Sequence, residues 1–142
     1  MKSKDKIENR LPEIGATLIF SSRNINVLNE ITAVSEVLPT KIRLPEDYKI
    51  KEFSGYDWQR EVKIHDAETI SEPLNQLIKL FEKNVENLTK LMQSYNLNAY
   101  IVIVIHANED ELPEIVIDPQ VISFANTIKA EISIDLYSYA ND

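Results

Sequence analysis

The most regular hydrophobic pattern in the chain lies between residues 73 and 95, in the stretch PLNQLIKLFEKNVENLTKLMQSY. Ser71 can cap a helix that starts here, and Pro73 fits the first turn, where its missing N–H costs little. The apolar residues recur at steps of three and four, which is the spacing of an amphipathic helix: Leu74, Ile78, Phe81, Val85, Leu88 and Met92. The pattern predicts one long helix whose apolar stripe faces a core.

Two shorter stretches, residues 24–38 and 118–129, also repeat apolar residues at helical spacing. The first stretch starts among asparagines that can cap a helix, and Pro39 is expected to stop it. The second opens with Asp118 as a cap and Pro119 just inside the helix. Both stretches are predicted to be amphipathic helices.

Short β-branched and aromatic runs, several of them alternating, predict the strands. These runs are residues 15–22, 40–44, 58–66, 98–108, 113–117 and 130–139. The run 98–108 is apolar on both alternating faces, which predicts a central strand that is covered on both sides. A charged turn at 109–113 separates it from 113–117, so these two runs are expected to form a hairpin.

The predicted order of elements is β-α-β-β-α-β-β-α-β. Its first six elements repeat the ferredoxin-like order βαββαβ, and the last three add a hairpin and a helix. The fold class is therefore predicted as α+β, with a mixed sheet and helices packed on it. A length of 142 residues suits one domain, so residues 1–142 are expected to form a single domain. Residues 1–14 are expected to be a flexible or loosely packed N-terminal segment.

Several short motifs follow one another along the chain: EVLPTKIRL, SGYDW, the long amphipathic helix, and ISIDLYSY. In this order and spacing the chain resembles the bacterial domain of unknown function 4279, over about residues 15–139. The stretch LPEDY departs from the family pattern, in which a Lys-Gly-Asp-like segment is expected. Members look similar to small bacterial proteins suspected of neutralising toxins. The resemblance therefore implies an immunity-type or inhibitory role.

The net charge is −8, and it is concentrated in the second half of the chain. Residues 72–142 carry four Lys or Arg against eleven Asp or Glu. Phosphate backbones and anionic membranes repel such a surface, so no nucleic acid and no membrane is expected as a partner. A protein partner, if there is one, is expected to be basic. The charged N-terminus and the short apolar run AYIVIVI lead us to expect a cytoplasmic protein.

The chain also lacks several residues that familiar chemistry requires. It has no cysteine, which excludes disulfides, zinc–thiolate sites and thiol nucleophiles. Its two glycines cannot form a P-loop or a dinucleotide fingerprint. His106 precedes the acidic run NEDE, but a solvated hairpin turn explains this run better than a metal site, and His65 beside Asp66 is read as a surface pair. No cofactor and no metal is expected.

Two patches are candidate binding sites. The first is FSGYDW at 53–58, where Tyr56, Asp57 and Trp58 could form an aromatic binding surface or could fold back over the core. The second pairs Asp135 with Tyr137 in an alternating strand, where aspartate is disfavoured. Asp135 could be a solvated residue, a structural acceptor or part of a site. We expect its carboxylate to accept a hydrogen bond from a neighbouring strand or from the SGYDW segment.

These features leave three functional hypotheses. The first is a non-enzymatic binding protein, such as an immunity-type or inhibitory partner of another protein. The second is a small-molecule-binding or regulatory domain with a pocket near Trp58, Asp135 and Tyr137. The third is a hydrolase that uses Asp135 and a histidine. Catalysis stays open, although the missing signatures favour a protein that is not an enzyme. The oligomeric state is also open, between monomer and homodimer.

Overall fold

The computed structural model describes residues 11–49 and 55–140. Its strands are β1 (Glu13–Ser22), β2 (Lys41–Arg43), β3 (Tyr56–His65), β4 (Asn98–Asn108) and β5 (Ala130–Tyr139). Its helices are α2 (Val27–Ser35), α3 (Ser71–Phe81), α4 (Val85–Tyr95) and α5 (Pro119–Thr127), with short 3-10 helices η1 (Pro45–Asp47) and η3 (Glu82–Asn84).

The five strands form one sheet in the order β2-β3-β1-β4-β5. β1 lies between β3 and β4 and is antiparallel to both, and β2 is antiparallel to β3. These four strands therefore have the split βαβ arrangement of the ferredoxin-like order. β5 joins the edge parallel to β4, which makes the sheet mixed. The predicted α+β class, with helices packed on a mixed sheet, is confirmed.

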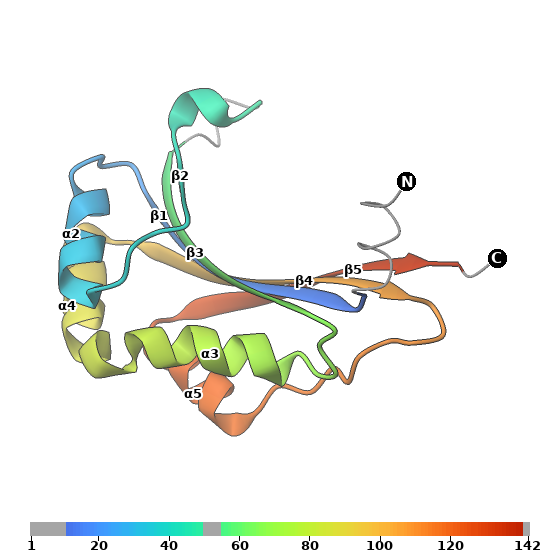
Figure 1. The fold of residues 1–142 in the computed structure, drawn as a ribbon. Helices are drawn as coiled ribbons and strands as arrows, with labels where there is room; N and C mark the ends of the chain where they lie inside the picture. Colours follow the sequence, from blue (N-terminus) through green and yellow to red (C-terminus); the bar gives the residue numbers. More distant parts are fainter. Residues whose placement is uncertain (1–10, 50–54, 141–142) are drawn as a thin grey trace.

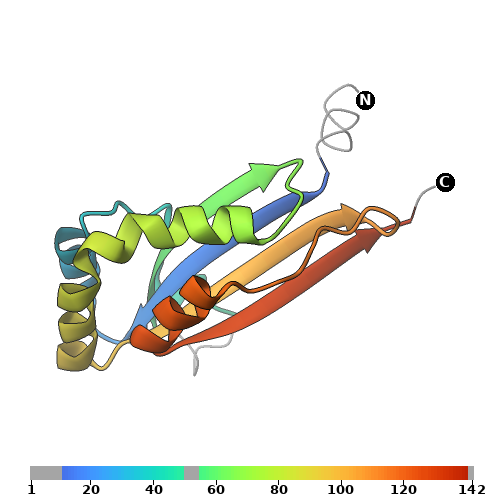
Figure 2. The same cartoon turned by 90° about the horizontal axis from the view of Figure 1, so that it is seen from below.

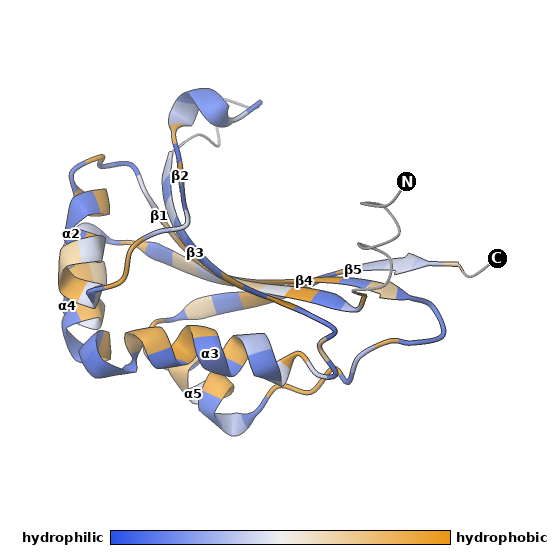
Figure 3. Cartoon of the chain, in the orientation of Figure 1, coloured by the Kyte–Doolittle hydropathy of each residue, from blue (hydrophilic) through white to orange (hydrophobic). Residues whose placement is uncertain are grey.

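The α-helices lie on one side of this sheet. Figure 1 shows α3 and α5 beneath the strands, with α2 and α4 at one end, and Figure 2 shows the same helices from below. Along the strands, apolar and polar residues alternate (Figure 3). We call the side against which α3 and α5 pack the covered face and the opposite side the open face. No α-helix formed by residues 11–49 or 55–140 covers the open face.

The centre of the core is an aromatic cluster on the covered face. The ring of Trp58 lies 5.8 Å from that of Phe20 and 6.0 Å from that of Phe81, and all three side chains are fully buried. The indole N–H of Trp58 donates a hydrogen bond of 3.0 Å to the Thr32 hydroxyl. Burial of these rings stabilises the fold, while the hydrogen bond satisfies the only polar atom of the indole.

The single long helix predicted over 73–95 is wrong, because the helix breaks at η3 into α3 and α4. The periodic stripe continues through the break: Phe81 and Leu88 are both buried, and Val85 is half-buried. At the break, the Asn84 amide donates to the Ser35 carbonyl at the end of α2, at 3.1 Å. The bend thus lets α3 follow the sheet while α4 packs against α2.

The strand predicted over 113–117 is also wrong. Among the described residues this segment makes one isolated parallel bridge, between Glu114 and Thr69, and has no strand of its own. The Glu114 N–H donates to the Glu68 carbonyl, and the Glu114 carbonyl accepts from Ile70. The physical reason is the direction of β5, since two neighbouring parallel strands need a crossover of a dozen or more residues rather than a hairpin.

β4 is a central strand, as predicted, but only one of its faces is covered by helices. Ile101, Ile103 and Ile105 are fully buried on the covered face. On the open face, Val102 and Val104 are only half-buried. Neighbouring strands shield these two side chains from the sides, so an apolar run on both faces did not require a second layer of helices.

Two smaller differences concern the first third of the chain. α2 ends at Ser35, four residues before Pro39, because Glu36 adopts a left-handed conformation with φ of 60°. Leu38, the last residue of the stretch predicted to be helical, is 71% exposed. The N-terminal segment expected over 1–14 overlaps β1, in which Ile14 is fully buried. Residues 1–10 lie outside the described residues.

Candidate functional site

The strand registers place two groups of polar and aromatic side chains on the open face, one at each end. Residues that are paired across the sheet point to the same side, and residues two positions apart along a strand do so as well. The open face consists of Lys41 and Arg43 on β2, Asp57, Gln59, Glu61, Lys63 and His65 on β3, Glu13, Gly15, Thr17, Ile19 and Ser21 on β1, Asn98, Tyr100, Val102, Val104, His106 and Asn108 on β4, and Glu131, Ser133, Asp135, Tyr137 and Tyr139 on β5.

Asp57 is the centre of the first group. Although it carries a carboxylate, it is only 7% exposed. It accepts a hydrogen bond of 2.6 Å from the hydroxyl of Ser21, its register partner on β1, and another from the hydroxyl of Tyr48. A desolvated carboxylate needs such donors. Asp57 is therefore a structural acceptor that ties the segment after η1 to the sheet.

Tyr48 is held from both sides in this group. Burial, together with the hydrogen bond to the Asp57 carboxylate and the negative charge of that carboxylate, raises the pKa of Tyr48 to about 12. The Arg43 guanidinium lies 4.1 Å from the centre of the Tyr48 ring, a cation–π contact. These contacts fix the ring with its hydroxyl on Asp57.

The aromatic neighbours of Asp57 in the sequence point the other way. Trp58 is part of the core on the covered face, and Tyr56 packs against that core while half-exposed. Strand alternation therefore separates Asp57 from both rings. For Trp58, the structure agrees with the alternative in which the ring folds back over the core. Phe53, the other aromatic residue of this patch, lies outside the described residues.

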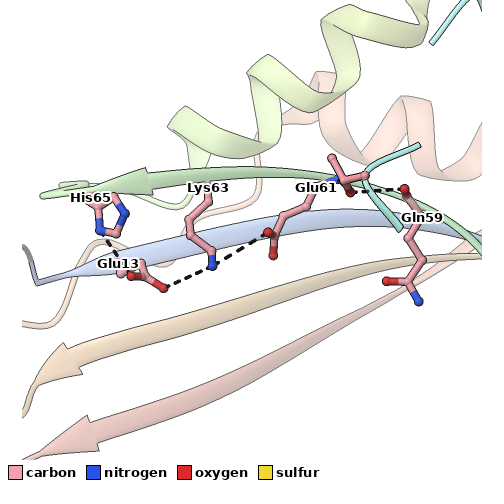
Figure 4. A network of polar contacts seen from close by, with 6 residues as sticks. Glu13, Gln59, Glu61, Lys63 and His65 are labelled. Atoms are coloured by element: carbon pink, nitrogen blue, oxygen red, sulfur yellow. Dashed lines mark hydrogen bonds and ion pairs between the residues drawn. The ribbon is translucent and has the colours of Figure 1, made fainter. Parts of the chain in front are cut away.

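The second group lies at the far end of the face, where one row of register partners crosses four strands: His65, Glu13, His106 and Tyr137. Glu13 is held between two bases: its Oε2 lies 3.2 Å from His65 Nδ1 and its Oε1 lies 3.7 Å from Lys63 Nζ (Figure 4). The His65 and Glu13 side chains lie within ion-pair distance, but His65 Nδ1 and the carboxylate do not meet the geometry of a hydrogen bond. Lys63 also reaches Glu61, at 3.9 Å.

Beside these charges, three rings are held parallel. The imidazole of His106 stacks on Tyr137, with centroids 4.9 Å apart and planes within 10°, and lies 6.1 Å from the ring of Tyr139. The Tyr139 hydroxyl is hydrogen-bonded to His106 Nδ1 at 2.8 Å. Tyr137 remains 51% exposed and Tyr139 44% exposed. We call His106, Tyr137 and Tyr139 the ring cluster.

Asp135 does not have the partner that we predicted. It is exposed on the open face, opposite Val104, and accepts no hydrogen bond within residues 11–49 and 55–140. The prediction of a donor from a neighbouring strand or from SGYDW is wrong for these residues. The reason is position: Asp135 lies on the edge strand, where water reaches the carboxylate, and Trp58 lies on the opposite face.

The five residues predicted as a site are thus not gathered in one place. Trp58 and Tyr56 belong to the covered side. Asp57 lies on β3, and two strands separate it from Asp135 and Tyr137 on β5. A pocket lined jointly by Trp58, Asp135 and Tyr137 is not formed.

Sequence reasoning missed the partners of Tyr137. His106 lies within the predicted strand 98–108, but the sequence does not show that its register partner is Tyr137. His65 was paired with its neighbour Asp66, but it faces Glu13 instead. The alternation of the strands shows which face each residue occupies, but only the register shows which residues meet across strands.

Comparison with known families adds one result. The family model named Domain of unknown function (DUF4279) matches residues 12–139, which is nearly the whole chain. The chain belongs to the DUF4279 family. No curated protein matches it, and no solved structure does. Membership of DUF4279 confirms the resemblance seen in the sequence, while the family's name assigns no activity.

Two further properties of the described residues bear on this DUF4279 domain. Within residues 11–49 and 55–140, no group of three or more His, Asp or Glu side chains is arranged to hold a metal ion. Every helix in the same ranges is too short or too polar to span a bilayer. The open face offers aromatic ring surface and charged side chains.

Proposed function

We propose that this protein binds another protein of basic character through the open face of its sheet, with the ring cluster as the anchor. An immunity-type or inhibitory partner of another protein is the role that fits this proposal. The observation that carries it is the ring cluster itself. Tyr137 and Tyr139 are about half exposed, yet His106 already holds both rings in place. Rings fixed before binding lose little conformational entropy when a partner covers them.

The charge around the rings indicates the character of the partner. Glu131 and Asp135 are exposed on the same face of β5. Of the basic side chains on this face, Lys63 is already shared between Glu13 and Glu61. Lys41 and Arg43 lie on β2, at the opposite edge of the sheet from β5. The net charge of −8 adds a long-range attraction for a positively charged protein. These charges favour fast association with a basic partner and a binding strength that falls with added salt.

The arrangement of the face supports a macromolecule more than a small ligand. β4 and β5 run side by side as long paired strands that extend past the helices at one end of the sheet (Figure 1). The hypothesis of a small-molecule pocket requires Trp58 at that pocket, but Trp58 is fully buried on the other face. Half-exposed rings on an extended strand surface suit a broad contact.

Affinity capture from the native cell, with three forms of the protein, tests the proposal. The forms are the wild type, Tyr137→Ser combined with Tyr139→Ser, and Leu80→Ser, which changes an exposed apolar residue of α3 on the helical side. We expect a basic protein that the wild type and Leu80→Ser retain and the double variant loses. With that protein purified, the double variant should bind about 10-fold or more weakly. Equal retention by the double variant, or loss only with Leu80→Ser, would contradict the proposal.

A further inference from the structure

The two edges of the sheet differ sharply. The β2 edge is only three residues long and carries Lys41 and Arg43, both features that discourage pairing with another strand. The β5 edge is ten residues long, Ala130–Tyr139, and pairs with β4 residue for residue without a bulge. It contains no proline and no lysine. Figure 2 shows no described element beyond it.

Exposed apolar side chains gather along the same edge. α5 packs against β5 but leaves Ile134 39% and Leu136 46% exposed on the covered face. A long unprotected edge with apolar side chains is a surface that another strand can extend.

We propose that β5 pairs in antiparallel fashion with β5 of a second copy of this chain, about a two-fold axis at Ile134. In this register, residues 130–138 of one copy face residues 138–130 of the other. On the covered face, Ile132 meets Leu136 and Ile134 meets its own counterpart. The exposed apolar residues of both copies then cover one another.

The open face of the same pairing matches acids with hydroxyls. Glu131 of one copy faces Tyr137 of the other, and Ser133 faces Asp135, so that no carboxylate opposes a carboxylate. The two registers one residue to either side lack this property. An axis at Ser133 sets Glu131 against Asp135, and an axis at Asp135 sets that residue against itself. The strand is therefore self-complementary about Ile134, which is what a two-fold contact between identical chains requires.

The pairing also has a consequence for the open face. It joins the two sheets into one across the axis, with a ring cluster from each copy on the same side. On the covered face this inference rests on Ile132, Ile134 and Leu136, and none of them belongs to the ring cluster. The dimer and the binding of a basic partner can therefore fail separately.

Measurement of mass in solution, by light scattering or sedimentation, tests the dimer. We expect the wild type to have twice the chain mass of 16.3 kDa. Ile134→Lys places two like charges opposite each other at the axis and should give a monomer. The matched control is Ile122→Lys, an exposed isoleucine on α5, which should remain a dimer. A monomeric wild type, or a folded Ile134→Lys variant that is still dimeric, overturns the proposal.

Single cysteines test the register independently, because the chain has none of its own. At the axis, two opposed Cα atoms lie about 4.5–5.5 Å apart, within the range that a disulfide spans. Diamide should therefore oxidise the two thiols of Ile134→Cys to an intermolecular disulfide. Leu136→Cys, on the same face, should stay unlinked, since the two thiols then lie about four residues apart along the pair. Linkage at Leu136→Cys without linkage at Ile134→Cys would show a different axis and overturn the register.

Discussion

The covered and open faces of the sheet are built from alternate residues of the same strands, yet different forces hold them. On the covered face, Ile103 and its neighbours are fully buried beneath the helices. On the open face, the next residue along β4, Val102, is only half-buried, and defined contacts are polar pairs such as Glu13 with Lys63. Apolar burial on the covered face therefore contributes most of the stability of the fold. The open face is freer to carry residues for binding.

The open face itself contains a second contrast, between two aspartates that both lie within strands. Asp57 is 7% exposed and accepts hydrogen bonds from two hydroxyls. Asp135 is exposed, and no described residue donates to it. The same side chain on the same face is structural in one place and solvated in the other, because only the first has been removed from water.

The largest difference is expected between neighbouring residues of β4. Ile103→Ala should lower the free energy of unfolding by about 2–5 kcal/mol, because it leaves a cavity in a packed core. Val102→Ala should cost about 1 kcal/mol, since it removes two half-exposed methyl groups. Both changes replace a β-branched residue by alanine in one strand, so the difference reports burial rather than strand propensity. Urea denaturation measures both, and equal losses would show that the two faces are equally packed.

A smaller loss is expected at Asp57. Asp57→Ala leaves the hydroxyls of Ser21 and Tyr48 without their acceptor and should cost about 1–3 kcal/mol. Ser21→Ala and Tyr48→Phe each remove one donor, so each should cost about 1 kcal/mol. In combination with Asp57→Ala, either change should add little, because the contact is already gone. Full additivity in urea denaturation would show that these groups are not coupled.

The fold was largely predictable because it follows from local periodicity. Five of the six strands predicted from β-branched, aromatic and alternating runs are present, and the stripe from Leu74 to Met92 gave the correct buried side of α3 and α4. Periodicity could not show the break at η3, since the steps of three and four continue across it. It could not show that 113–117 is a crossover either, because that depends on the parallel direction of β5.

The site was less predictable, because it is made of contacts between distant residues. Neighbours in the sequence, Asp57 and Trp58, suggested one patch, but alternation sends them to opposite faces. Conversely, His65, Glu13 and Tyr137 are far apart in the chain and share one row. Register is fixed by the packing of the whole sheet and not by any single motif.

A further test concerns the ionisation of Tyr48. Its pKa is raised to about 12, so the folded protein keeps this proton more tightly than the unfolded chain, whose tyrosine pKa is near 10. The resulting stabilisation is fully present below pH 10 and is lost as the pH rises from 10 to 12. Phenolate absorbance should show one tyrosine that ionises near pH 12. Tyr48→Phe should remove that step, and Asp57→Asn should lower its pH; an unchanged step in Tyr48→Phe would assign it to another residue.

The smallest effect on stability is expected at Asp135. Its carboxylate is exposed in the folded protein as in the unfolded chain, so Asp135→Asn removes no hydrogen bond to the described residues and no desolvated charge. The free energy of unfolding should change by less than about 0.5 kcal/mol. Asp135→Leu should also fold with nearly unchanged stability, because an apolar residue suits a strand at least as well as aspartate. This outcome is the opposite of the one expected at Asp57, where the same loss of charge breaks two contacts.

Thermal and urea denaturation measure the stability of both Asp135 variants. A loss as large as that of Asp57→Ala would mean that Asp135 is desolvated in the folded protein. If the proposed basic partner contacts this face, both variants should remain folded while they bind that partner more weakly, and the difference from wild type should shrink as salt screens the charge.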